Sequence, residues 1–186
     1  IVLNTVMRHF KLLFLFSLIF ILVSTLGKNC YAQMKNVILE SIEIEKDSIL
    51  VTSTGSDIKA SSMETNECPG FPTDLQAQWM LLMSLSVGDS TIKENIYFDR
   101  FTHILELNRL GCDVHLDKDH AVIKGDRFLI GADVMSTDIR ASAALIIAAL
   151  CAEGSTSISR VYHIDRGYDR IEEKLVKVGA KITRKK

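Results

Sequence analysis

Hydrophobic and polar residues alternate over 41–45 and 49–52, and this pattern predicts a β-hairpin turning at Lys46-Asp47-Ser48. Longer patterns of helical period follow. The most apolar of them, 138–152, is rich in alanine and almost uncharged, so we expect this helix to be buried on nearly every side. The other predicted elements are helices at 75–87, 101–110 and 168–178, strands at 90–94, 155–159 and 181–184, and a second hairpin made of 113–116 and 121–124.

Two stretches of this pattern repeat each other at a spacing of about 65 residues. Each contains a helix start, a helix, a strand, an Asp-Arg loop, a second helix, a glycine and a final strand. One such unit is too small to enclose a core, so we expect the helices of the two units to pack around a shared centre. The identical pairs are Thr73/Thr137, Asp74/Asp138, Ala77/Ala141, Gly88/Gly154, Ile92/Ile158, Asp99/Asp165, Arg100/Arg166 and Gly111/Gly179.

An uncharged, strongly apolar run at 12–27 stands apart from the rest of the chain. As a helix it would be roughly 24 Å long, short of the ~30 Å hydrocarbon core of a bilayer. Basic residues precede it, and Cys30-Tyr31-Ala32 offers a small-x-small step for a signal peptidase. The run therefore fits a secretory signal better than a membrane anchor, with a buried core helix as the alternative. We divide the chain into an apolar leader, 1–33, and a folded part, 34–186.

The overall charge of −1 combines a basic leader with a folded part of net charge −4. Such a balance argues against a protein that binds nucleic acid through its phosphate backbone. The cysteines and histidines are scattered, with no CxxC pair or other ligand spacing, so we predict no metal site and no cofactor.

The repeat places similar polar residues at equivalent points of the two units. Asp74 and Asp138 stand at helix N-termini, while Arg100 and Arg166 lie in strand-to-helix loops. Arg140 lies in the first turn of a helix, where a cation is unfavourable unless an anion accompanies it. Together these residues predict a site for a polyanionic small molecule, with carboxylates available for proton transfer.

A purely structural interpretation of the same residues is also open. Asp74 and Asp138 could be helix N-caps that contribute about 1 kcal/mol each. Arg100 and Arg166 each follow an aspartate, so they could form ion pairs that only hold their loops.

Three segments resemble the C-terminal part of the UDP-N-acetylglucosamine 1-carboxyvinyltransferases, a family of enolpyruvyl transferases: PGFPTDLQAQW (69–79), STDIRASAALIIAAL (136–150) and YHIDRGYDRIEEKL (162–175). The resemblance runs from about Ile42 to the C-terminus and leaves out residues 1–33. It implies an α/β fold, the inside-out α/β barrel, in which two domains of three similar units hold substrates between them. The two repeated units would then be an incomplete part of one domain.

The resemblance also implies a reaction, the transfer of the enolpyruvyl group of phosphoenolpyruvate to the 3-hydroxyl of UDP-N-acetylglucosamine in peptidoglycan precursor synthesis, in the cytoplasm. By this resemblance Asp74 is a catalytic base that faces the sugar hydroxyl, and Ile96 contacts the sugar nucleotide through its backbone. Arg166 would bind phosphoenolpyruvate. The resemblance also implies that Arg100, Asp138 and Arg140 line the same cleft, with Asp138 as a second catalytic carboxylate.

The family's other domain, with its Lys-Asn pair and the loop cysteine or aspartate that acts as general acid, has no counterpart in this sequence. We therefore expect a C-terminal fragment from a truncated or split gene, inactive unless the N-terminal part complements it, because catalysis depends on positioning by both sides of the cleft. Two alternatives stay open. One is an enzyme similar to 3-phosphoshikimate 1-carboxyvinyltransferase, and the other is a non-catalytic remnant that residues 12–27 tether to a membrane or direct to export.

Overall fold

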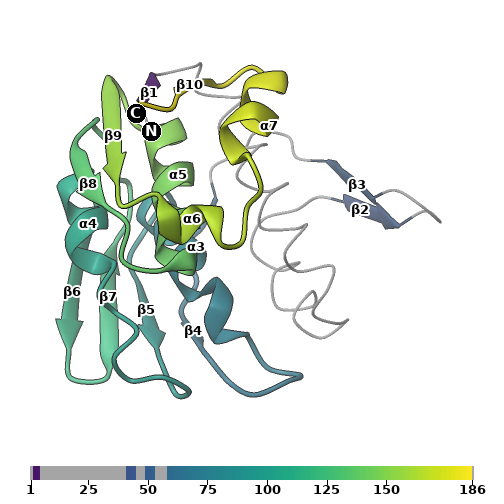
Figure 1. Ribbon diagram of the computed structural model, residues 1–186. Coiled ribbons are helices and arrows are strands. Elements are labelled where there is room, and N and C mark those ends of the chain that lie inside the picture. Colours follow the sequence, from purple (N-terminus) through teal and green to yellow (C-terminus); the bar gives the residue numbers. More distant parts are fainter. Residues whose placement is uncertain (1, 5–40, 45–48, 53–57, 186) are drawn as a thin grey trace.

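The computed structural model describes residues 2–4, 41–44, 49–52 and 58–185 (Figure 1). The apolar run 12–27 and most of the proposed leader lie outside these residues. No helix in the described part of the chain is long and apolar enough to cross a membrane.

The first of the two predicted units is a four-stranded sheet in the order β4-β5-β7-β6. Strand β4 runs parallel to β5, whereas β7 is antiparallel to both of its neighbours. The elements are β4 (Met63–Glu64), the 3₁₀ helix η1 (Thr73–Leu75), α3 (Gln76–Ser84), β5 (Ser90–Lys93), α4 (Ile104–Arg109), β6 (Asp113–Asp117) and β7 (His120–Lys124).

The second unit repeats this sheet in the order β8-β9-β1-β10. Strand β8 is parallel to β9, and β1 is antiparallel to both β9 and β10, so β1 takes the place that β7 has in the first unit. The elements are β1 (Val2–Asn4), β8 (Asp133–Met135), α5 (Ile139–Cys151), β9 (Ser155–Ser159), α6 (Tyr162–Asp165), α7 (Ile171–Lys177) and β10 (Lys181–Thr183). The repeat predicted from the sequence is thus confirmed in the topology.

Glycines at equivalent positions confirm the repeat at the level of the backbone. Gly88 and Gly154 have φ values of 97° and 90°, and Gly111 and Gly179 have φ values of 101° and 94°. Residues with a Cβ atom rarely adopt such angles, which is why glycine follows each helix at these points.

Most predicted elements are present, but the second helix of each unit begins later than expected. The expected helix 101–110 starts at Ile104, and the expected helix 168–178 starts at Ile171. The residues before each start form turns, together with the short helix α6, and they carry the two Asp-Arg pairs. The predicted hairpin over 41–52 is also confirmed, as β2 (Ser41–Ile44) paired with β3 (Ile49–Thr52).

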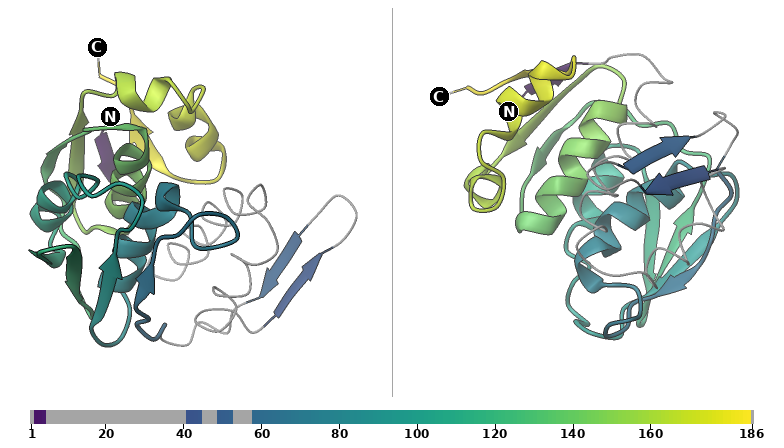
Figure 2. Two further views of the ribbon diagram at one scale, coloured as in Figure 1. Left: turned by 90° about the horizontal axis from the view of Figure 1, so that it is seen from below. Right: turned by 90° about the vertical axis from the view of Figure 1, so that its right-hand side faces the viewer.

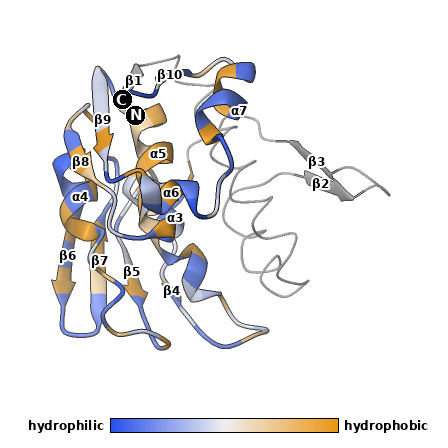
Figure 3. Cartoon of the chain, viewed as in Figure 1, coloured by the Kyte–Doolittle hydropathy of each residue, from blue (hydrophilic) through white to orange (hydrophobic). Residues whose placement is uncertain are grey.

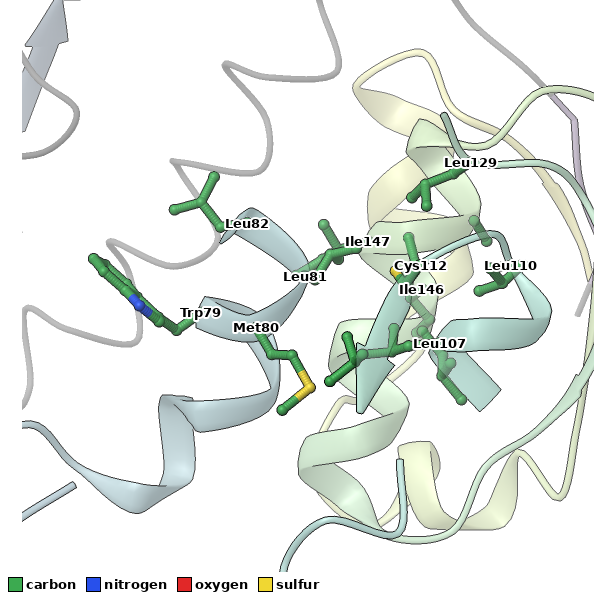
Figure 4. Close-up of a cluster of buried hydrophobic side chains, with 14 of the residues drawn as sticks. Trp79, Met80, Leu81, Leu82, Leu107, Leu110, Cys112, Leu129, Ile146 and Ile147 are labelled. Carbon is green, nitrogen blue, oxygen red and sulfur yellow. The ribbon is translucent and has the colours of Figure 1, made fainter. Parts of the chain in front are cut away.

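Helices α3 and α5 lie side by side between the two sheets (Figure 2). Every residue of α3 is buried, and α5 is apolar beyond its first turn (Figure 3). Leucine and isoleucine side chains from α3, α4 and α5 meet in one hydrophobic cluster (Figure 4). The expected burial of 138–152 around a shared centre is therefore confirmed, and the polar helix starts lie at the margin of this core.

Candidate functional site

Asp74 joins the two units through a pair of arginines. One of its oxygens, Oδ1, accepts hydrogen bonds from Arg100 Nη1 at 2.9 Å and from Arg140 Nε at 2.5 Å. Arg100 comes from the loop after β5 of the same unit, whereas Arg140 comes from the first turn of α5 in the other unit. The Asp74 side chain is 51% exposed, and its second oxygen, Oδ2, has no hydrogen-bond partner within 58–185. A half-exposed carboxylate oxygen therefore stands beside two guanidinium groups.

The interpretation of Asp74 as a helix N-cap is wrong. Pro72 precedes a turn of 3₁₀ helix, and α3 then starts at Gln76 with no side-chain cap. The turn directs Asp74 toward the arginines instead. The anionic partner that Arg140 was expected to need is thus Asp74, and this pairing offsets the cost of a cation at a helix N-terminus.

Asp138 occupies the equivalent position in the second unit and does cap its helix. Its backbone is extended, and Oδ1 accepts hydrogen bonds from the backbone N–H groups of Arg140 at 2.8 Å and Ala141 at 3.1 Å. Its other oxygen, Oδ2, lies 3.4 Å from Thr137 Oγ1. The capping interpretation is confirmed for Asp138, and its catalytic role stays a prediction.

Arg100 is held on three sides. Besides Asp74, its Nη1 donates to Thr73 Oγ1 at 2.7 Å, and its guanidinium carbon lies 4.3 Å from the centre of the Tyr97 ring. These contacts leave the side chain only 17% exposed. The hypothesis that Arg100 pairs with the preceding aspartate is wrong, because its ionic partner is Asp74, 26 residues earlier in the chain.

Arg166 differs from Arg100 although both follow an aspartate. It is exposed in the turn after α6 and forms no ion pair with any residue that the structure describes. Its preceding Asp165 pairs instead with Arg184, whose guanidinium lowers the pKa of that carboxyl. The next residue, Gly167, packs so closely on Ile139 that an added Cβ would lie 2.1 Å from Ile139 Cδ1. Ile139 stands between Asp138 and Arg140 in the chain, so this contact brings the Arg166 turn to the start of α5.

The residue that sequence reasoning missed is Glu94, which is 1% exposed at the end of β5. Its carboxylate accepts hydrogen bonds from the backbone N–H groups of Ile96 and Tyr97 and from the hydroxyls of Thr65 and Thr73. A signal was present in the pattern, since alternation along 90–94 places Ser90, Ile92 and Glu94 on the buried face.

His103 lies buried below the site, 2% exposed, beside the carbonyl of Arg100. Burial lowers its pKa to about 4, and the positive charge of Arg100 acts in the same direction, while Asp138 and Glu94 oppose it. His103 is therefore neutral at pH 7. Among the described residues no three His, Cys, Asp or Glu side chains gather as metal ligands.

Comparisons with known proteins agree with this architecture. A model of the EPSP synthase (3-phosphoshikimate 1-carboxyvinyltransferase) family matches residues 23–175. The UDP-N-acetylglucosamine 1-carboxyvinyltransferase of Chlorobium luteolum is 50% identical over 145 residues, which are 78% of this chain and 34% of that protein. The protein of the same name from Myxococcus xanthus is 53% identical over 144 residues, covering 73% and 34%.

Among solved structures, the enolpyruvyl transferase NikO from Streptomyces tendae superimposes with a TM-score of 0.75 at 26% identity, over 82% of this chain and 35% of that chain. An EPSP synthase from Acinetobacter baumannii shares the fold, with a TM-score of 0.60 at 17% identity, over 84% of this chain and 36% of that chain. The chain spans about a third of the length of the curated relatives it matches. With two repeated α/β units and a family match over most of its residues, this chain belongs to the EPSP synthase family of enolpyruvyl transferases.

Proposed function

We propose that this chain forms part of the substrate site of a UDP-N-acetylglucosamine 1-carboxyvinyltransferase. In the proposed reaction Asp74 accepts the proton of the sugar 3-hydroxyl as its oxygen adds to C2 of phosphoenolpyruvate, while a general acid donates a proton to C3. Loss of the phosphate group from C2 and of one proton from C3 then yields the enolpyruvyl ether. About 50% identity to proteins of that name supports this assignment over a 3-phosphoshikimate enzyme.

The observation that carries the proposal is the asymmetric use of the Asp74 carboxylate. Oδ1 is held by Arg100 and Arg140, so the orientation of the group is fixed, and Oδ2 is left to accept a hydrogen bond from a sugar hydroxyl. The guanidinium groups would meet the negative charges of the substrates. In this proposal Ile96 contacts the nucleotide through its backbone, Arg166 binds phosphoenolpyruvate, and Asp138 keeps Arg140 in place by capping α5.

We also propose that the chain does not complete the reaction alone. The rest of the cleft, including the general acid that protonates C3, would come from the part of the relatives that this chain does not span. Both substrates are anions. By analogy with the relatives, we place the reaction in the cytoplasm.

The test combines the purified chain with a separately expressed N-terminal two thirds of a relative and measures phosphate release from phosphoenolpyruvate and UDP-N-acetylglucosamine. We expect release only from the mixture. Release by the chain alone would contradict the proposed need for complementation. A thermal shift of the chain with UDP-N-acetylglucosamine, but not with shikimate 3-phosphate, separates the two substrate assignments.

Replacing Asp74 with alanine tests the site itself. Loss of a charge-assisted hydrogen bond costs about 1.5–3 kcal/mol, so the Kd for UDP-N-acetylglucosamine should rise roughly 10- to 100-fold in calorimetric titration. Asp99→Ala is the matched control, because Asp99 is exposed in the neighbouring loop and forms no ion pair with a described residue. Equal effects of the two changes would contradict the assignment of Asp74.

A further inference from the structure

Glu94 is a buried carboxylate whose position the second unit does not reproduce. The repeat offset places Arg160 opposite it, an exposed residue at the end of β9. A buried carboxylate is stable only where donors replace the water it has lost, and Glu94 has four of them. The role of Glu94 therefore depends on which parts of the chain these four donors hold in place.

Three of the donors fasten the loop that follows β5. Oε1 accepts from Thr65 Oγ1 at 2.7 Å and from the N–H groups of Ile96 and Tyr97 at 3.0 Å each. Thr65 in turn accepts from the N–H of Asn95 at 2.9 Å. The first residues of the loop are thus tied to a single buried oxygen, and their backbone takes one course toward Arg100.

The fourth donor connects Glu94 to the arginine. Oε2 accepts from Thr73 Oγ1 at 3.0 Å, and Thr73 Oγ1 accepts from Arg100 Nη1 at 2.7 Å. A guanidinium group can only donate, so the Thr73 hydroxyl must direct its own proton to Glu94. The hydrogen bonds therefore run in one direction, from Arg100 through Thr73 to Glu94. The same Nη1 of Arg100 also donates to Asp74.

We infer that Glu94 is a positioning residue for the nucleotide side of this site. It fixes the Ile96–Tyr97 backbone directly and, through the Thr73 hydroxyl, holds Arg100 against Asp74. The part of this inference that concerns the nucleotide rests on the proposed function, whereas the part that concerns the loop does not.

Amide hydrogen exchange in the full chain tests the loop directly, and Glu106 supplies a matched control. Glu106 is a second buried glutamate, 6% exposed, whose Oε2 accepts from the N–H of Met135 at 2.9 Å. In Glu94→Ala the amides of Ile96 and Tyr97 should exchange at least about 10-fold faster, with Met135 unchanged; Glu106→Ala should give the reverse pattern. Unchanged exchange at Ile96 and Tyr97 in Glu94→Ala would overturn the inference, whether or not the chain binds nucleotide.

Binding of UDP-N-acetylglucosamine tests the connection to Arg100. Glu94→Gln keeps a carbonyl oxygen for the two amides but places an NH₂ group where Thr73 needs an acceptor, and Thr73→Val removes the same hydrogen bond from the other side. Each of these two variants should raise the Kd about 5- to 10-fold. The double variant should raise the Kd no more than the larger single effect, because both changes remove the same hydrogen bond. The control Glu106→Gln should raise the Kd less than about 2-fold. Equal effects of Glu94→Gln and Glu106→Gln would overturn the connection, and absence of binding by the unaltered chain would instead refute the proposed function.

Discussion

The two units share a fold and an Asp-Arg pair, but they use the pair in opposite ways. In the first unit Arg100 is bound to Asp74, and Asp99 is exposed without an ionic partner in the described part of the chain. In the second unit Asp165 is bound to Arg184, and Arg166 is left exposed. The helix starts differ similarly, because Asp138 caps α5 whereas Asp74 caps nothing. A repeated motif therefore repeats the backbone and leaves the partner of each side chain to its surroundings.

The largest expected difference between the units lies at their equivalent glycines. An added Cβ at Gly111 would lie 2.8 Å from the Phe128 carbonyl oxygen, whereas nothing lies within 4 Å at Gly179. Both have positive φ, so both substitutions are strained, but only Gly111→Ala also displaces backbone. We expect losses of about 3–4 kcal/mol for Gly111→Ala and about 1–2 kcal/mol for Gly179→Ala in urea unfolding. Equal losses would show that backbone strain alone matters.

His103 gives the first unit a sensitivity to acid. Its pKa is about 4 in the folded protein and near 6.5 in the unfolded chain, so the unfolded chain binds the proton more readily between these values. The contribution of His103 to the free energy of unfolding should not change with pH above pH 7. As pH decreases toward 4, this contribution should lower the free energy of unfolding by up to about 3 kcal/mol. His103→Leu should flatten that decrease in urea titrations at several pH values.

The two helix-start aspartates should differ by a smaller amount. Asp138→Ala removes a cap that accepts two backbone hydrogen bonds and should lower the free energy of unfolding by about 1 kcal/mol. Asp74→Ala removes the ion pairs of a half-exposed carboxylate, so its effect on stability should stay within about 0.5 kcal/mol. Equal losses in urea unfolding would mean that the two positions are structurally alike.

The ion pairs of Arg184 should have the smallest effect. Arg184 lowers the pKa of both Asp165 and Glu172, so its stabilisation is present above their unfolded values, near 4, and is lost as pH falls through the lowered folded values. Because these side chains are partly exposed, Arg184→Met should cost only about 0.5–1 kcal/mol at pH 7. The difference from the unaltered chain should shrink as pH falls below about 4. Asp99→Asn, which breaks no ion pair to a described residue, is the control at pH 7.

Periodicity alone was sufficient for most of the fold. The hairpins, the buried helix α5 and the glycines that end each helix follow from local pattern and backbone sterics, and the structure confirms them. The delayed starts of α4 and α7 were not predictable in this way, because the turns before them are held by contacts from distant residues. Glu94, for example, binds Thr65, 29 residues earlier in the chain.

The site was predictable in its membership but not in its connections. Arg140 was expected to need an anion because of the helix dipole, which is a local argument, but only the packing of α3 against α5 made Asp74 that anion. Asp74 and Asp138 occupy similar sequence contexts, each preceded by threonine and followed three residues later by alanine, and a turn of 3₁₀ helix after Pro72 separates their roles. The repeat and the buried helices follow from the order of residues alone, because they depend on near neighbours in the chain. Which charges pair depends on the fold, because a side chain can bind only a group that the folded chain brings within about 3 Å of it.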